Sequence, residues 1–167
     1  RVNNNQLEFK DYSMESCNNC IELFNLNCPE FFAPIEKNDY IEFLNQTKEG
    51  YVTIHHDSIL IGAYGVHKTS SESASQSWTL IHPKYQNQGI GRLIMERVFS
   101  YLKSNQLDNL FLSTSQQTEA FFLKFGAIRI DYIENGWDEG LHRIEMKIER
   151  AIRLSLIHIS EPTRPVP

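Results

Sequence analysis

The sequence predicts a single domain of mixed α and β structure. Its 167 residues are close to the length of one domain, and a hydrophobic share of 41% is ordinary for a soluble globular protein. Between residues 13 and 47 the apolar residues recur mostly at helical spacing, whereas over residues 51–68 they alternate with a period of two. Helical and strand-like segments then follow one another up to residue 149 without an internal repeat. These observations predict one compact core built from both helices and strands.

The N-terminal half of the chain predicts a strand, two helices and a hairpin. Residues 6–12 alternate weakly between apolar and polar and therefore predict a first strand. Residues 13–26 and 36–47 predict helices, because their apolar side chains recur at helical spacing and prolines interrupt the chain between them. Residues 51–68 predict a hairpin, in which two β-rich runs flank a turn at residues 56–58.

The central part predicts a loop, two strands and two helices. A polar, serine-rich stretch over residues 69–77 predicts a loop, and the Trp, Thr, Leu and Ile within residues 77–83 predict a central strand. Residues 91–104 predict an amphipathic helix. After it, residues 109–115 predict a short buried strand, and residues 117–126 predict a helix that ends at its terminal glycine.

The domain is predicted to end with a second hairpin, formed by residues 127–136 and 142–149. The remaining stretch continues no hydrophobic period and carries three prolines among its last six residues. Its segment LSLIHISEPTRP also resembles the translation of a sequencing-adapter read-through. We therefore predict a single domain over residues 1–149 and a non-native or disordered tail over residues 150–167.

Charge and composition argue against nucleic-acid and membrane partners. Lys and Arg number 16 and Asp and Glu number 21, so the formal net charge is −5, and the basic residues form no block. Nucleic acids and anionic membrane surfaces are both bound through clustered positive charge. No apolar run approaches the roughly 18 residues that a membrane span requires, and the N-terminus does not resemble a signal peptide. We therefore expect a cytoplasmic protein without nucleic-acid or membrane partners.

Three cysteines, Cys17, Cys20 and Cys28, lie close together in the N-terminal region. A disulfide framework normally has an even count spread through a smaller chain, so this set predicts reduced thiols on or beside a helix. The CNNC segment supplies half of the ligands of a zinc site, but the sequence offers no second C-x-x-C or H-x3-H pair. We therefore expect no bound metal.

Two glycines, Gly89 and Gly91, stand between the predicted central strand and the helix that follows it. The first backbone N–H groups of a helix have no intrahelical partners and lie at the positive end of the helix dipole, so such a turn suits a phosphate group. Glycine lets an anion approach the main chain directly and lets the turn adopt a positive φ. Lys84 and Arg92 would add positive charge on either side. The alternative is that the glycines only permit a tight turn or close packing, since the GxxxxGK[ST] and GxGxxG phosphate motifs are both absent.

The glycine loop and a later segment carry a resemblance to a known family. Residues 86–91, Gln-Asn-Gln-Gly-Ile-Gly, match the Q/R-x-x-G-x-G/A motif of the GNAT acyltransferase superfamily, and the stretch IHPKYQNQGIGRLIM resembles that family's strand, loop and helix. Residues 119–128, EAFFLKFGAI, are similar to its second signature, a-x-x-F-Y-x-K-x-G-F. The resemblance implies a mostly antiparallel sheet with splayed fourth and fifth strands, helices on both faces, and acetyl-CoA bound in the V between those strands.

The resemblance also implies how acetyl-CoA is held and used. Its pyrophosphate would lie on the backbone amides of residues 88–92, and its pantetheine would pair with the backbone of residues 80–82. In this family an amine attacks the thioester carbonyl directly, a base accepts the amine proton, and an acid protonates the departing thiolate. The residues that we assign to acetyl-CoA in this way are Leu80, Ile81, His82, Gln86, Asn87, Gln88, Gly89, Ile90, Gly91, Arg92, Ser115, Gln116 and Phe122.

The catalytic positions depart from the family's pattern. The usual acid is a tyrosine, but Phe122 stands at the matching position and cannot donate a proton. The strands that commonly carry the base have hydroxyl side chains such as Ser113, which can hold a water but cannot act as bases at neutral pH. We predict His142, Glu119 and Ser113 as catalytic residues, although a carboxylate in the first turn of a helix is also favoured by the dipole alone. Any of five tyrosines could serve as the acid, namely Tyr12, Tyr40, Tyr51, Tyr64 and Tyr85.

The second predicted hairpin gathers an aromatic residue and two carboxylates. We predict that Trp137, Asp138 and Glu139 bind the acceptor, as an aromatic wall and negative charge for a cationic amine. The alternative is a turn with solvated charges, built around Asn135-Gly136.

Two functions of different classes follow from these observations. The first is an acetyl-CoA-dependent N-acetyltransferase, a monomer or homodimer, that acts on a primary amine of a small molecule or peptide. The second is a catalytically degenerate module that binds acyl-CoA as a sensor or partner, which the phenylalanine at position 122 favours. Acylation of aminoacyl-tRNA is disfavoured by the net charge of −5.

Overall fold

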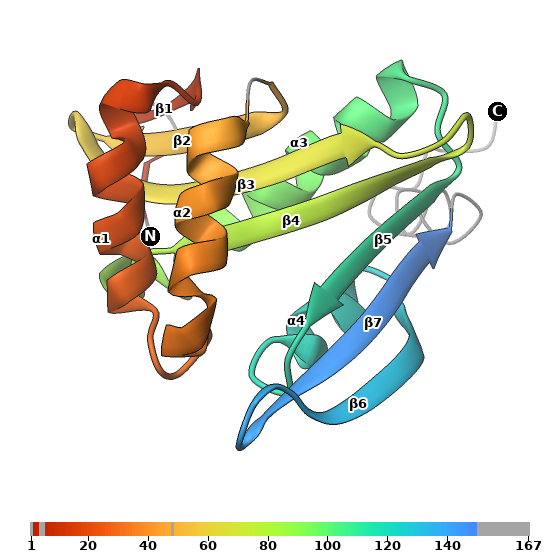
Figure 1. The fold of residues 1–167 in the computed structure, drawn as a ribbon. Helices are drawn as coiled ribbons and strands as arrows, with labels where there is room; N and C mark the ends of the chain where they lie inside the picture. Colours follow the sequence, from red (N-terminus) through yellow and green to blue (C-terminus); the bar gives the residue numbers. More distant parts are fainter. Residues whose placement is uncertain (1, 4–5, 48, 150–167) are drawn as a thin grey trace, which may run out of the picture.

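The computed structural model describes residues 2–3, 6–47 and 49–149, which form a seven-stranded sheet in the order β1-β2-β3-β4-β5-β7-β6 (Figure 1). Neighbouring strands are antiparallel except for β4 and β5, which are parallel. The prediction of a mixed, mostly antiparallel sheet is therefore confirmed. The strands are β1 (Leu7–Asp11), β2 (Tyr51–His56), β3 (Ile59–Lys68), β4 (Ser73–Ile81), β5 (Asn109–Thr114), β6 (Ile128–Asp138) and β7 (Leu141–Glu149).

Helices cover both faces of the sheet, with α1 and α2 on one side and α3 on the other (Figure 1). The side chains of β3 alternate between the two faces, because successive residues of a strand point in opposite directions. Leu60 lies in the core beneath α1 and α2, whereas Ile61 lies in the core beneath α3. The helices are α1 (Cys17–Leu26), α2 (Lys37–Gln46), α3 (Ile90–Ser104) and α4 (Glu119–Lys124), with short 3-10 turns η2 (Met14–Ser16), η3 (Pro34–Glu36) and η4 (Pro83–Tyr85).

The fourth and fifth strands separate partway along their length (Figure 1). Residues 73–76 of β4 pair with residues 109–112 of β5, and the pairing ends at Gln76 and Leu112. Beyond that point β4 continues to Ile81 and β5 continues to Thr114 without pairing to each other. The predicted splay is therefore present, and it leaves backbone groups of both strands facing the gap between them.

A bulge in β4 lies within its separated part. The pairing of β3 with β4 shifts between Ala63 and Gly65, and Trp78 in the bulge has a φ of +43°. A left-handed conformation is costly for a bulky side chain, so surrounding contacts must hold it. The Tyr51 hydroxyl donates a 2.8 Å hydrogen bond to the Trp78 carbonyl, and the indole ring lies 4.9 Å from the Tyr40 ring between their centroids.

Replacing Tyr51 by phenylalanine tests this support. The Trp78 carbonyl would lose its donor in a part-buried setting, and the Tyr40 hydroxyl would lose the Tyr51 hydroxyl that lies 2.7 Å from it. We expect the free energy of unfolding to fall by about 1 to 3 kcal/mol, as measured by urea denaturation. A Tyr101→Phe variant, at a half-buried position of α3 whose hydroxyl has no hydrogen bond within the described residues, is the control and should change it by less than about 0.5 kcal/mol.

Two element boundaries differ from the sequence prediction. β4 begins at Ser73, so most of the serine-rich stretch predicted as a loop is strand, because it pairs with β3 on one side and β5 on the other. β6 continues past Asn135-Gly136 to Asp138, and the turn lies instead at Glu139-Gly140. The predicted tail over residues 150–167 lies outside the described residues. In the part of the chain that is described, no helix is long and apolar enough to cross a membrane.

Candidate active site

A cavity of about 890 Å³ opens where β4 and β5 separate. Its walls come from the α1–α2 connection, the exposed ends of β4 and β5, the loop into α3, and helices α3 and α4. Trp137 and Glu145 from the β6–β7 hairpin also line it. The same cavity is therefore lined by the glycine loop and by three carboxylates, those of Glu30, Glu36 and Glu145.

The glycine loop forms the end of the cavity beside α3. Gly89 precedes α3 in the left-handed conformation with a φ of +88°, and Asn87 also has a positive φ of +60°. A Cβ atom on Gly91 would lie 2.9 Å from Cε1 of Phe121, so no larger residue fits there without displacing that ring. The unpaired amides of the helix start, the positive end of the dipole and the missing side chains together make a cradle that fits a phosphate group.

Neighbouring side chains hold the loop in place. The Lys84 backbone N–H donates a 3.1 Å hydrogen bond to Nδ1 of His82, and Nε2 of Gln88 donates a 2.8 Å hydrogen bond to the Lys84 carbonyl. Burial and the charge of Lys84 lower the pKa of His82, so its ring stays neutral and keeps an acceptor nitrogen at neutral pH. The exposed Arg92 also lines the cavity and adds positive charge at this end.

Most residues that we assigned to acetyl-CoA lie at this end or along β5 and α4. Those that line the cavity are Ile81, Gln86, Asn87, Gly89, Gly91, Arg92, Ser115 and Phe122. Leu80 and Ile90 are instead buried in the two cores, so only their backbone atoms are available for the predicted role. The described residues that line the cavity do not include His82, Gln88 or Gln116.

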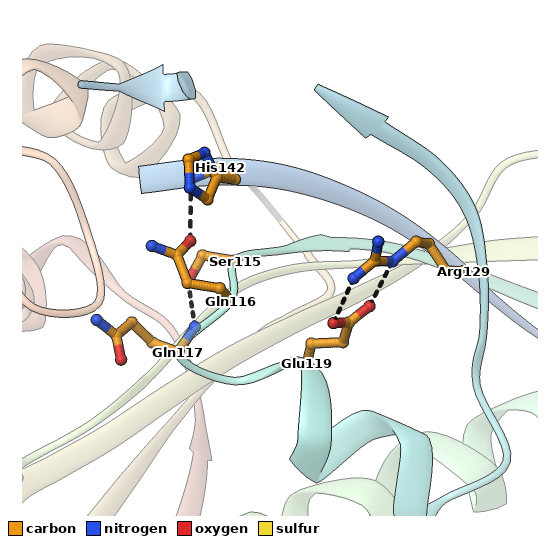
Figure 2. Close-up of polar contacts among 6 residues, drawn as sticks. All are labelled: Ser115, Gln116, Gln117, Glu119, Arg129 and His142. Carbon is orange, nitrogen blue, oxygen red and sulfur yellow. Dashed lines mark hydrogen bonds and ion pairs between the residues drawn. The ribbon is translucent and has the colours of Figure 1, made fainter. Parts of the chain in front are cut away.

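Gln116 connects the β5–α4 loop to the final hairpin rather than facing the cavity (Figure 2). Its Oε1 accepts a 2.9 Å hydrogen bond from the His142 backbone N–H, and its Nε2 donates to the Gly140 carbonyl. In the same loop the Ser115 hydroxyl accepts a bond from the backbone N–H of Gln117. These bonds fix the side of the cavity that Ser115 lines.

Two of the three predicted catalytic residues, Glu119 and His142, have hydrogen-bond partners in the β5–α4 loop and the β6–β7 hairpin (Figure 2). Glu119 accepts two 2.7 Å hydrogen bonds from Arg129, which lower the pKa of its carboxyl group and make it a weaker base. Nδ1 of His142 accepts a 3.0 Å hydrogen bond from the Asn135 backbone N–H, and its ring lies beside Tyr132. Neither is among the described residues that line the cavity.

The third predicted catalytic residue, Ser113, does line the cavity. Its hydroxyl donates a 2.6 Å hydrogen bond to Oε2 of Glu145, which stands opposite it in the pairing of β5 with β7. Oε1 of Glu145 accepts a 2.5 Å bond from Nε of Arg143. Sequence reasoning missed Glu145, although its place between the buried Ile144 and Met146 indicates a side chain on the opposite face of β7.

A second missed carboxylate, Glu36, lines the cavity from the α1–α2 connection. It is 8% exposed, and within the described residues its side chain has one hydrogen bond, a 2.8 Å bond from the Ala33 backbone N–H to Oε2. Burial raises the pKa of Glu36, with a smaller contribution in the same direction from Asp39, while Arg143 acts in the opposite direction. In the sequence Glu36 lies at the start of a predicted helix, where carboxylates are common. No sequence signal therefore distinguished it from a solvent-exposed carboxylate.

The predicted acceptor residues are divided by the structure. Trp137 lines the cavity, and its Nε1 donates a 2.9 Å hydrogen bond to the Thr114 carbonyl. The guanidinium carbon of Arg143 lies 4.7 Å from the centroid of the indole ring, so one face of that ring already contacts a cation. Asp138 and Glu139 are exposed at the hairpin end and are not among the described residues that line the cavity.

The raised pKa of Glu36 predicts a dependence of stability on pH. In the unfolded state Glu36 loses its proton near the ordinary pKa of 4.5, whereas the folded state retains that proton to a higher pH. Glu36 therefore lowers the free energy of unfolding as pH rises from 4.5 through the pKa of the folded state. Glu36→Gln keeps an oxygen acceptor for the Ala33 N–H and removes that cost. We expect a Tm higher by about 2 to 4 °C at neutral pH, with the gain shrinking toward pH 4.5.

Thermal denaturation across that pH range measures the effect. The control is Glu42→Gln on the exposed side of α2, which makes the same charge change away from the cavity. A Tm gain in the Glu36 variant that does not shrink at low pH would rule out carboxylate desolvation as its cause.

A protein-family model matches most of the chain. The model of the acetyltransferase (GNAT) family matches residues 20–127, which include both splayed strands and the glycine loop. No match is found among curated protein sequences.

Several solved structures share the fold. Ard1 from Thermoplasma volcanium is 12% identical with a TM-score of 0.72, over 86% of this chain and 97% of that chain. The ribosomal-protein-S18-alanine N-acetyltransferase from Escherichia coli is 12% identical with a TM-score of 0.70, over 96% and 99%. The structure of yncA from Salmonella typhimurium with its cofactor acetyl-CoA is 10% identical with a TM-score of 0.65, over 87% and 94%.

Proposed function

The chain belongs to the acetyltransferase (GNAT) family, which uses acetyl-CoA, and from that premise we propose that it acetylates a primary amine of a small molecule or peptide. The observation that carries this proposal is one cavity lined both by the glycine loop and by the carboxylates Glu30, Glu36 and Glu145. The glycine loop suits the phosphates of an anionic donor substrate, and the carboxylates suit an amine.

The residues of the cavity fit acetyl-CoA. The cradle at Gly89 and Gly91 would hold the pyrophosphate, and the unpaired backbone of β4 beyond Gln76 would pair with an extended chain that carries amide groups. Acetyl-CoA supplies the acyl thioester. The end of the strand pairing at Gln76 and Leu112 limits how far such a chain can reach along β4, so the reaction would take place near that point.

The proposed reaction exchanges one bond for another. The amine nitrogen forms a bond to the acyl carbon, the carbon–sulfur bond breaks, one proton leaves the nitrogen and one is taken up by the sulfur, giving an amide and a free thiol. Ser113 can accept the proton from nitrogen while it passes its own to Glu145, to which it already donates. Binding both reactants side by side can lower the barrier by about 7 to 11 kcal/mol, so the reaction does not depend on an ideal acid.

Release of free thiol tests the proposal. The full chain is mixed with acetyl-CoA and a panel of primary amines, and the thiol is measured across about pH 6 to 9, with the amine omitted to measure hydrolysis. Thiol release that depends on an amine supports the proposal. Release that stays at the hydrolysis rate with every amine contradicts it.

A second function is favoured by one observation, the phenylalanine at position 122. Its ring lines the cavity where the family resemblance implies a tyrosine, so the departing thiolate has no phenolic donor there. An acyl-CoA-binding sensor needs the cradle and not the acid. Tight binding of acetyl-CoA by calorimetry, together with no turnover of any amine, would favour this function.

A further inference from the structure

One buried polar atom of the cavity has no partner. Oε1 of Gln76 is the single side-chain nitrogen or oxygen of this kind within the described residues, and Gln76 is 6% exposed. Its Nε2 donates a 3.0 Å hydrogen bond to the Thr79 hydroxyl, which orients the amide. A buried acceptor without a donor is costly, so a group that donates a hydrogen bond is expected there during function.

Gln76 lines the cavity at the point where β4 and β5 separate. It forms the last parallel pair with Leu112 before β4 and β5 separate, and both residues line the cavity together with Phe122. An extended donor substrate entering from the glycine loop along β4 would place its reacting end at this position. Gln76 Oε1, which lacks a hydrogen-bond donor, is therefore beside the expected position of the reacting amine.

Part of the cavity wall carries carboxylates that form no ion pair within the described residues. They are Glu30 and Glu36, which line the cavity from the α1–α2 connection. Arg143, the cation on the opposite hairpin, already pairs with Glu145 and contacts the Trp137 ring. Glu36 is nine-tenths buried, so it is less screened by water than a surface carboxylate.

Gln76 Oε1 and the Glu36 carboxylate can both accept hydrogen bonds from a bound molecule, and Glu36 forms no ion pair within the described residues. We propose that the acceptor is an amine with a second positive charge, whose reacting N–H is held by Gln76 Oε1 and whose second charge is held by Glu36. This inference rests on the proposed acetyl transfer and names the class of acceptor for it. Gln76 would fix the nitrogen beside the acyl carbon, and Glu36 would select which amines enter.

Matched pairs of acceptors test the inference with the full chain. Straight-chain diamines from diaminopropane to diaminooctane are each compared with the monoamine of the same length, and kcat and KM are measured by thiol release. We expect the best diamine to exceed its monoamine in kcat/KM by about 10-fold or more, since one desolvated charge contact of about 1.4 kcal/mol gives that factor. Equal values for every pair would overturn the inference while leaving acetyl transfer intact.

Three variants separate the roles of Glu36 and Gln76. Glu36→Gln keeps the bond from Ala33 and is expected to remove the preference for diamines over monoamines, mainly by raising KM for the diamine. Gln76→Leu is expected to lower kcat/KM about 10-fold to 100-fold for both acceptors, leaving their ratio and the affinity for acetyl-CoA unchanged. Gln76→Glu keeps an acceptor oxygen, so its activity is expected to rise with pH as the carboxyl group loses its proton. A loss of packing alone would not produce this dependence on pH. A diamine preference that survives in Glu36→Gln, or full activity in Gln76→Leu, would overturn the corresponding assignment.

Calorimetry gives a readout that does not need turnover. Diamines are titrated into the chain saturated with free coenzyme A, and binding is expected in the parent and in Glu42→Gln but not in Glu36→Gln. Binding of diamines without thiol release would contradict acetyl transfer and support the role of Glu36 in binding the second charge. Absence of diamine binding in the parent would contradict that role, whatever the thiol assay shows.

Discussion

Replacing Gly91 by leucine is expected to weaken acetyl-CoA binding by at least about 100-fold. The Cβ atom alone would meet Cε1 of Phe121 at 2.9 Å and its Cζ at 3.0 Å, and the rest of the leucine side chain has to enter the cradle or push the ring into the cavity. Either result separates the phosphate groups from the amides at the start of α3. Losing two hydrogen bonds to a charged group, at about 1.5 to 3 kcal/mol each, accounts for a factor of this size.

The fold should survive the Gly91→Leu change, because leucine favours a helix more than glycine does by about 0.8 to 1 kcal/mol. Calorimetric titration with acetyl-CoA measures the affinity, and circular dichroism checks the fold. Ser100→Leu introduces the same side chain at an exposed position on α3 and should leave the affinity unchanged. Unchanged affinity in Gly91→Leu would mean that the phosphates lie elsewhere, and the assignment of the glycine loop would fail.

The order of elements could be predicted because hydrophobic period and turn residues are local signals. The helices and the first hairpin follow from apolar spacing alone, and the structure has them within a few residues of the predicted bounds. The start of β4 could not be predicted, because Ser73 and its neighbours have weak strand preference and become a strand through pairing on both sides. Pairing partners are distant in sequence, so no local pattern carries that information.

The candidate site divides in the same way. The glycine loop is a contiguous motif, and the structure places Gly89 and Gly91 on the cavity as expected for a cradle. Glu36, Gln76 and Glu145 come from three separate elements and share the cavity only after folding. His142 and Glu119 are suitable residue types near the right elements, but local hydrogen bonds to the hairpin and to Arg129 determine where they point.

A Phe122→Tyr variant is expected to increase kcat by about 10-fold to 100-fold. The Phe122 ring is 8% exposed and lines the cavity, so an added hydroxyl can face the site of reaction. A phenol there could protonate the departing thiolate, and general acid catalysis typically contributes about 10²- to 10⁴-fold when the acid is well placed. A gain at or below the bottom of that range is expected here, because the surrounding residues are not adapted to hold a hydroxyl. Thiol release at saturating acetyl-CoA and acceptor measures kcat.

Phe125→Tyr distinguishes this effect from a general gain of polarity. Phe125 follows Phe122 by one helical turn and packs against Phe99 and Phe121, but it is not among the described residues that line the cavity. Its tyrosine variant should leave kcat unchanged. A gain in Phe122→Tyr alone would show that the cavity places both substrates correctly and lacks only the acid. If kcat stays the same while acetyl-CoA still binds, protonation of the thiolate does not limit the rate. The sensor function gains support from that result only if the parent chain also shows no turnover.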